Sequence, residues 1–255
     1  MVEESASPLL KIHSPRHSLA SLIINSRREL KIPFVDNPPS FLGLSVLKGT
    51  CKNMAGTVFT PSLEGMKLVK SEEGHLLAKP FLEMCKNVLP VIEKLGSALT
   101  LVKSDIGGNI TRLENKYSSD PSKYHLLYSM MKEELAAKKA KDSSSCTNGL
   151  LWLTRAMDFL VQMFCNLIEH AEWTMPQACS DAYSKTLKKW HGWVASTTFT
   201  AAMKLAPERK KFMEIIGEGG GDLNADIRNF CTMFPPILEE NHKFLASVGM
   251  DDLKA

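Results

Sequence analysis

The segment from Gly149 to His170 is the most apolar stretch of the chain, and it constrains the fold most strongly. After the glycine it reads L-L-W-L-T-R-A-M-D-F-L-V-Q-M-F-C-N-L-I-E-H, with few polar side chains. A helix that is apolar on nearly all sides must lie inside a protein core. We therefore expect a central buried helix here, to which Trp152, Arg155 and Asp158 are the exceptions.

Helical periodicity continues through most of the chain after residue 53, and alternating strand patterns are nearly absent. Apolar residues recur at helical spacing from Lys79 to Leu95, where Pro90 should cause a bend. A helix at 121–140 should begin at Pro121, and the last helix should be broken at Pro235 and Pro236. Other helices are expected at 102–117, 194–205, 208–216 and 223–248, and after Pro176. The predicted class is all-α, with about eight helices.

Residues 1–53 differ in composition from the rest of the chain. Ser, Pro, Arg and His are scattered there among short apolar pieces, so we predict an N-terminal extension that is mostly disordered and a helical domain at 54–255. The extension holds seven Lys or Arg against four Asp or Glu, whereas the domain is balanced at 24 of each. This balance argues against a nucleic-acid groove, and no apolar run is long enough to span a bilayer.

The cysteines and histidines show no metal-binding or disulfide pattern. Six cysteines occur without a C-x-x-C pair, and none of the seven histidines pairs with another ligand at metal-like spacing, so we expect reduced cytosolic thiols, no metal and no cofactor. The glycines of 217–222 resemble a phosphate loop, but no strand precedes them. Asp222 is more simply the cap of the last helix.

A polar triad interrupts the second helical pattern. In a helix, Asp105, Asn109 and Arg112 would share one face. The adjacent Gly107 and Gly108 each weaken a helix by about 1 kcal/mol relative to Ala. Taken alone, the triad fits an ordinary exposed Asp/Arg face better than a binding site for a hydroxyl-rich ligand.

Two further residues change that balance. Trp152 lies in the most buried helix, and His191 lies within K-K-W-H-G-W; each alone is ordinary. Together with the triad they supply carboxylate and amide groups for sugar hydroxyls, an aromatic face for a sugar ring, and an imidazole for one more polar contact. Carbohydrate recognition by such a set requires no acid/base partner.

Three ordered motifs of the chain resemble the glycolipid transfer protein family. They are D-I-G-G-N-I-T-R at 105–112, L-L-W-L-T-R-A-M-D-F-L at 150–160 and L-K-K-W-H-G-W at 187–193. The resemblance implies a two-layer all-helical sandwich that encloses an apolar lipid pocket. It also implies a non-enzymatic carrier, which takes a glycosphingolipid from the cytosolic leaflet of one membrane and delivers it to another.

The resemblance also assigns roles to individual residues. Asp105 would bond sugar hydroxyls and the ceramide amide N–H, Asn109 the sugar, and His191 the amide carbonyl, while Trp152 would stack under the first sugar ring. Arg112 stands where family members often have Lys, and a planar fork is not equivalent to a point charge.

The same resemblance places the lipid chains and the membrane. Phe199, and more loosely Val91 and Ile92, fall near acyl-pocket positions. Trp193 falls at the membrane-contact surface, with Trp190, Lys188 and Lys189 nearby. We expect transient peripheral contact with cytosolic membrane faces, a monomer, and no nucleic-acid partner.

Three alternatives remain open at this point. The pocket could serve a lipid sensor or partner-binding module, or it could carry ceramide-1-phosphate. The related branch that carries phosphorylated ceramide has cations where Asn109 and Trp152 stand, so these neutral residues favour a sugar head group. A hydrolase would need a nucleophile, a metal set or paired carboxylates, none of which is evident in the sequence.

Overall fold

The computed structural model describes residues 56–96 and 99–254, and helices make up nearly all the regular structure in this part of the chain. The predicted disordered extension, 1–53, lies outside it. Isolated bridges pair Lys70 with Leu76 and Leu77 with Leu126, and no strand occurs in these residues. The all-α prediction is confirmed.

The α-helices are α2 Thr60–Lys67, α3 Ala78–Lys86, α4 Leu89–Glu93, α5 Thr100–Ser119, α6 Leu127–Ala136, α7 Cys146–Glu169, α8 Met175–Lys185, α9 Trp193–Met203, α10 Arg209–Gly217 and α11 Leu223–Ser247, with a 3₁₀ turn, η2, at Lys188–Trp190.

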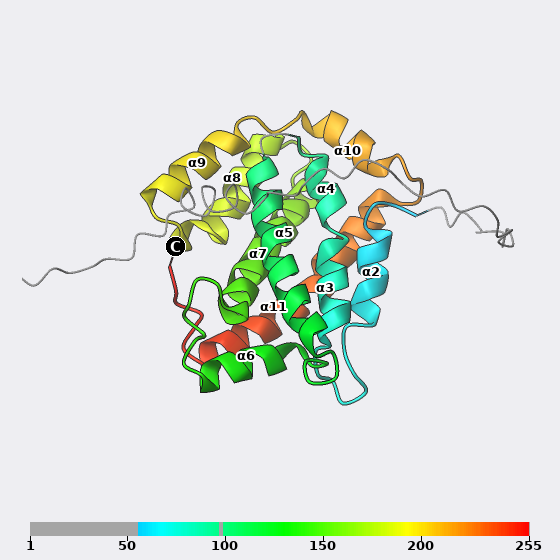
Figure 1. Cartoon of the computed structure of the whole chain (residues 1–255). Coiled ribbons are helices and arrows are strands. Elements are labelled where there is room, and N and C mark those ends of the chain that lie inside the picture. The colour runs from blue at the N-terminus through cyan, green and yellow to red at the C-terminus, as the bar shows by residue number, and fades with distance from the viewer. Residues whose placement is uncertain (1–55, 97–98, 255) are drawn as a thin grey trace, which may run out of the picture.

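The helix α7 occupies the centre of the molecule and packs against α5, α8 and α11 (Figure 1). It begins at Cys146, somewhat earlier than the sequence suggested, because the Ser145 hydroxyl accepts a hydrogen bond from the Asn148 N–H at 3.0 Å and so caps it. Most of its side chains are buried, including Leu150, Phe159 and Phe164. The predicted central buried helix is confirmed.

The helices form two packed layers around this core. In Figure 1, α3 and α5 lie in front of α7 and α11, and contacts join α3 to α5, α5 to α7, and α7 to α11. The helix α7 lies between its neighbours, so that residues on one side contact α5 and residues on its other sides contact α8 and α11.

The helix expected at 121–140 begins later than predicted. Pro121 opens a turn, Leu126 is extended, and α6 starts only at Leu127. The reason is tertiary: the Leu127 N–H donates to the Leu76 carbonyl and the Ala78 N–H to the His125 carbonyl, each at 2.9 Å. These bonds tie the segment to the loop before α3 and override the local signal of a proline after a capping residue.

The prolines also act differently from the prediction. Pro235 and Pro236 lie inside α11, which continues without a break. Phe234, Ile237 and Leu238 are buried beside them, and this burial maintains the helix despite the lost backbone bonds. Pro90 instead separates two helices, since it occupies the first turn of α4, where its missing N–H removes no helical bond.

Candidate functional site

The polar triad lies on α5 and faces the first turns of α7. A Cβ added at Gly149 would lie 3.3 Å from Arg112 Cδ and 3.7 Å from Asn109 Oδ1, and Arg112 donates a hydrogen bond to the Ser145 carbonyl at 3.2 Å. Asn109 is only 6% exposed. The interpretation of these residues as an ordinary exposed face is therefore wrong, and Gly149 is the residue that leaves room for them.

The Asp105 carboxyl group is electrostatically unfavourable in this position. Burial raises its pKa to about 6, and the nearby Arg112 cation opposes the rise only in part. A half-buried carboxylate that has lost water gains most from a ligand that donates hydrogen bonds to it. Asp105 is therefore suited to accept bonds from hydroxyl or amide N–H groups.

No atom of the described residues explains the paired glycines beside this carboxyl. A Cβ at Gly107 or Gly108 would have nothing within 4 Å among the described residues. The helix therefore does not require glycine for packing here. The idea that they let a ligand come close to α5 stays a prediction.

Trp152 and His191 lie together although they are far apart in the sequence. Trp152 follows Gly149 by one helical turn of α7, and His191 follows η2. Their rings are 5.9 Å apart between centroids, with 29° between the planes, and both are half-buried. Along α7, Gly149 thus contacts the polar face of α5, and the next turn carries an aromatic ring beside an imidazole.

The His191 ring is held in its neutral form. Burial and, to a smaller extent, the positive charge of Arg155 together lower its pKa to about 4. Its Nδ1 lies 3.2 Å from the Tyr183 hydroxyl, which in turn lies 3.0 Å from the Ser196 hydroxyl. Neutral imidazole offers one N–H and one lone pair, so His191 is equipped for a single oriented polar contact.

Tyr183 and Arg155 are the residues of this region that the sequence did not identify as functional. Tyr183 belongs to α8 and was one aromatic among several in an amphipathic helix. Arg155 appeared only as an exception within the apolar helix. Its guanidinium carbon lies 5.0 Å from the centroid of the Trp152 ring and 3.7 Å from that of Trp190.

Trp190 makes a contact that the sequence did not indicate. It is half-buried, and its ring packs against the Arg155 guanidinium. Its expected place at the membrane-contact surface stays a prediction. Trp193, the first residue of α9, has 81% of its surface exposed.

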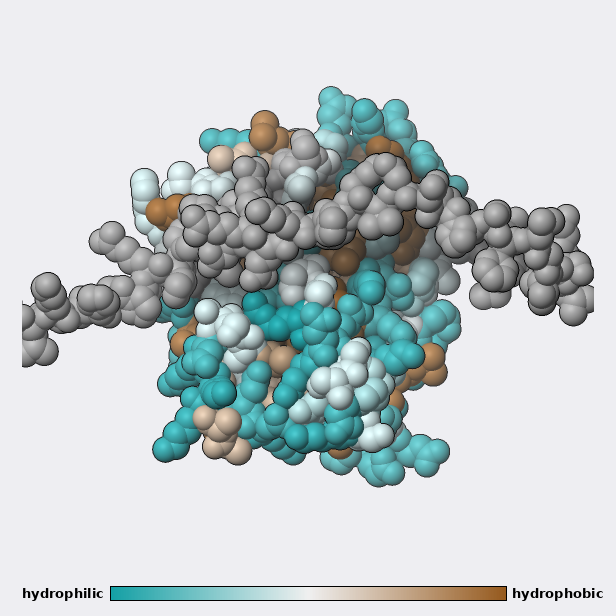
Figure 2. All heavy atoms as spheres, in the orientation of Figure 1, coloured by the Kyte–Doolittle hydropathy of each residue, from teal (hydrophilic) through white to brown (hydrophobic). Residues whose placement is uncertain are grey.

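Exposed apolar residues lie at both ends of α9, and we call Trp193, Val194 and Leu205 together the α9 patch. Val194 is 47% and Leu205 75% exposed, and the exposed Lys188 and Lys189 precede them in the chain. In Figure 2 the surface around the place of α9 in Figure 1 is mostly pale, with a few brown spheres at its left edge and toward the segment that leads to α10. Apolar side chains beside lysines are typical of a surface that meets a lipid interface.

The residues expected at the acyl pocket lie in two places. Val91 and Ile92 of α4 are buried in the core. Phe199 of α9 stacks on Tyr183 at 4.5 Å and meets Phe159 edge-on at 5.2 Å, between ring centroids. Phe199 thus touches both α7 and α8 close to His191, and its acyl-pocket role stays a prediction.

Comparison with known proteins shows to which family the chain belongs. Residues 76–218 match the model of a family described as glycolipid transfer protein. The chain belongs to the glycolipid transfer protein family. This confirms the resemblance drawn from the three motifs, which lie within the matched residues.

Relatives of the glycolipid transfer protein family match most of the chain. Glycolipid transfer protein 1 of Arabidopsis thaliana is 67% identical over 202 residues, which are 79% of this chain and all of that protein. A solved structure, described as showing how FAPP2 selects simple glycosphingolipids using the GLTP fold, has 26% identity and a TM-score of 0.71, and covers 78% of this chain and all of that one. An Arabidopsis ACD11 variant complexed with C12 ceramide-1-phosphate is similar in fold, with 19% identity, a TM-score of 0.70, and coverage of 77% and 99%.

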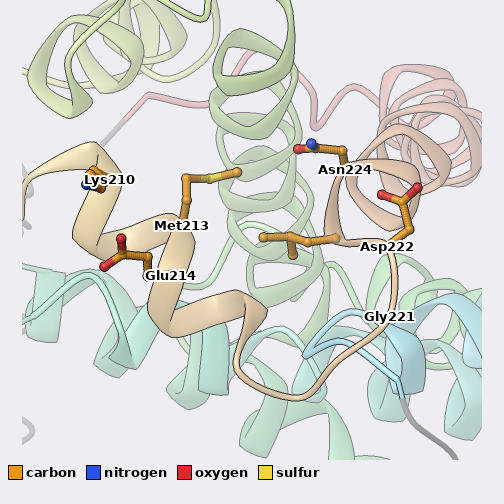
Figure 3. A pocket seen from close by; sticks show the side chains of 7 residues that line it. Lys210, Met213, Glu214, Gly221, Asp222 and Asn224 are labelled. Atoms are coloured by element: carbon orange, nitrogen blue, oxygen red, sulfur yellow. The ribbon is translucent and has the colours of Figure 1, made fainter.

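A hollow between α10 and the start of α11 lies away from the candidate site (Figure 3). It includes Gly221 and Asp222 of the glycine-rich loop. Asp222 accepts a hydrogen bond from the Ala225 N–H at 3.0 Å and caps α11, as predicted. Among the described residues no group of three His, Cys, Asp or Glu side chains is placed to hold a metal ion, and no helix is long and apolar enough to cross a membrane.

Proposed function

We propose that this protein binds a glycosphingolipid at the site formed by Asp105, Asn109, Trp152 and His191, and transfers it between membranes without chemical change. The observation that carries the proposal is the pairing of the Trp152 ring with the His191 imidazole, one helical turn along α7 from Gly149, which lies against Asn109 and Arg112 of α5. Membership of the glycolipid transfer protein family supports it.

Each group of the site has a task that follows from its chemistry. Asp105 accepts hydrogen bonds from a sugar hydroxyl and the ceramide amide N–H, and Asn109 bonds further hydroxyls. The half-exposed Trp152 ring offers its apolar face to the sugar. Neutral His191 bonds the amide carbonyl, and Arg112 holds the α5 face against α7 through the Ser145 carbonyl.

The charges favour a sugar over a phosphate head group. Asp105 would repel a phosphate, and Asn109 and Trp152 offer no positive charge to bind one. The cation on α7, Arg155, packs against the rings of Trp152 and Trp190, and both of its terminal nitrogens donate to backbone carbonyls. Carriage of ceramide-1-phosphate is therefore the weaker alternative.

The lipid chains require an apolar space of comparable area, because burial of apolar surface contributes about 25 cal/mol per Å². We place the entry of the chains at Phe199, with Val91 and Ile92 deeper in the core. Phe199 packs on aromatic rings of α7 and α8, so chain entry requires α9 to move away from them. The α9 patch would meet the cytosolic face of a membrane at the same moment, as a peripheral and reversible contact.

The test is transfer of fluorescent galactosylceramide between vesicles by the wild type, Trp152→Ala and Trp173→Ala. Trp173 is a matched control, since its ring also stacks on a histidine, His170, at 3.8 Å, but outside the site. We expect Trp152→Ala to lose transfer with an unchanged helical spectrum, and Trp173→Ala to keep it. Wild-type transfer by Trp152→Ala would refute the proposal.

The same experiment distinguishes the rival functions. A lipid sensor or partner-binding module would bind galactosylceramide tightly and transfer it slowly or not at all. Ceramide-1-phosphate supplied in the same vesicles tests the phosphate alternative directly. A hydrolase would release free sugar or ceramide, and mass spectrometry of the lipid after incubation would detect it.

A further inference from the structure

Arg155 is a charged residue in the interior of the central helix. It is 1% exposed, and burial lowers its pKa to about 10, with the carboxylates of Asp251 and Asp158 opposing the change. The guanidinium is therefore positive at neutral pH. A buried cation is costly unless its surroundings compensate it, so its partners should reveal why it is there.

The contacts of Arg155 join three separate parts of the chain. Its Nη1 donates to the Leu253 carbonyl at 2.7 Å, and its Nη2 donates to the Asp251 carbonyl. The guanidinium lies against the Trp190 ring of η2 and near the Trp152 ring of its own helix. One side chain therefore connects α7, the turn before His191 and the C-terminal segment.

The C-terminal segment is fastened on its other side as well. His242 of α11 lies between two carboxylates, with Nε2 2.7 Å from Asp158 Oδ2 and Nδ1 2.9 Å from Asp251 Oδ1. The segment that supplies the carbonyl partners of Arg155 is thus itself held against α7 and α11. This arrangement limits the freedom of the guanidinium.

We propose that Arg155 is a positioning residue of the head-group site: its guanidinium, held by the C-terminal carbonyls, keeps the Trp152 ring and the turn that carries His191 in fixed relation to each other. The proposal rests on the proposed function, because Trp152 and His191 are the two residues that it positions. It adds a residue that contacts no ligand but determines how two contacting residues are placed.

The partners of the Arg155 guanidinium distinguish a positioning role from direct ligand binding. The terminal nitrogens of the guanidinium are occupied by backbone carbonyls, and the tryptophan rings lie close to the group. Its Nε has no partner among the described residues. Lysine has the charge but neither the planar face nor the paired donors.

The test compares Arg155→Lys and Arg155→Met with Arg209→Met. Arg209 is a matched control, since its guanidinium also donates to backbone carbonyls, those of Leu167, His170 and Trp173, but away from the site. Three quantities are measured: affinity for galactosylceramide in vesicles, tryptophan emission of the lipid-free protein, and the titration of His191 by NMR, assigned with His191→Gln.

We expect both Arg155 variants to bind galactosylceramide roughly tenfold more weakly, the size of one lost cation–π contact, and to shift the tryptophan emission. The His191 pKa should rise in Arg155→Met, because a neighbouring positive charge is gone, and stay low in Arg155→Lys. Arg209→Met should change thermal stability alone.

Two results would overturn the proposal. One is an Arg155→Met protein with wild-type emission and wild-type His191 titration. The other is an Arg209→Met protein that reproduces the Arg155 changes, which would make them a general effect of losing a buried cation. If the wild type itself fails to bind galactosylceramide, the proposed function fails, while emission and titration of the lipid-free protein still decide the role of Arg155.

Discussion

Replacing Asp105 with Asn should stabilise the lipid-free protein and remove its binding of glycolipid. The two effects have one cause. Burial raises the pKa of the Asp105 carboxyl to about 6, so at neutral pH the fold holds a carboxylate in a place that favours the protonated acid. Asn has nearly the same shape and carries no charge, and it can no longer accept hydrogen bonds at both positions.

The size of the gain follows from the two pKa values. Between the ordinary pKa of 3.8 and about 6, each pH unit corresponds to about 1.4 kcal/mol, so the penalty at neutral pH is at most about 3 kcal/mol. The wild type should lose stability as pH rises from about 4 to about 6, because the folded state binds the proton more tightly than the unfolded state. Above that range the loss is complete. Asp105→Asn should show no such fall.

Urea unfolding at pH 4 to 8, followed by circular dichroism, measures this directly. Asp142→Asn is the control, since Asp142 is exposed and its replacement should alter the free energy of unfolding by no more than about 0.5 kcal/mol. Transfer of galactosylceramide is measured on the same samples. Equal or lower stability of Asp105→Asn at pH 7 would refute the electrostatic argument, and undiminished transfer would refute the assignment of Asp105 to the head group.

Four further substitutions have defined outcomes. Ion pairing with two aspartates raises the His242 pKa to about 9 and stabilises the fold only while the ring is protonated, so the wild type should lose stability between pH 6.5 and about 9. His242→Gln should abolish this loss. A free energy of unfolding that still falls with pH in the variant contradicts the argument. Trp193→Ala should weaken sedimentation with vesicles. Leu68→Ala, which removes an exposed apolar side chain just after α2, should not; equal losses would show that hydrophobicity alone matters. Gly107→Ala and Gly108→Ala should each stabilise α5 by about 1 kcal/mol in thermal unfolding yet reduce transfer, and unchanged transfer would remove any ligand role for the glycines.

Much of the candidate site could be predicted from the sequence because its signals are local. A helix that places Asp105, Asn109 and Arg112 on one face follows from spacing alone, and so does the burial of α7. The distant partners of Arg155 could not be predicted in this way, because its carbonyl acceptors lie near the C-terminus and the nearer of its two aromatic neighbours, Trp190, lies in η2. Nothing in L-L-W-L-T-R-A-M-D indicates that the arginine would be buried.

The errors in the fold have the same physical origin. Pro121 follows a plausible capping residue, yet backbone pairing with the loop before α3 delays the helix to Leu127. Pro235 and Pro236 should break a helix by local rules, yet the buried side chains around them maintain α11. In each case a contact between distant segments overrides a local preference.

The spacing of residues along α7 couples the stability of the protein to its proposed function. Gly149, Trp152 and Arg155 succeed one another by three residues, so Trp152 lies between the glycine that admits the polar face of α5 and the arginine that meets η2 and the C-terminal segment. A change at Gly149 or Arg155 therefore disturbs core packing and the Trp152 ring together, and stability and binding should fall in parallel. Asp105 lies on α5, and its charge opposes folding, whereas under the proposed function the same charge accepts hydrogen bonds from the ligand. Variants of α7 and of Asp105 should consequently move stability in opposite directions while both reduce transfer.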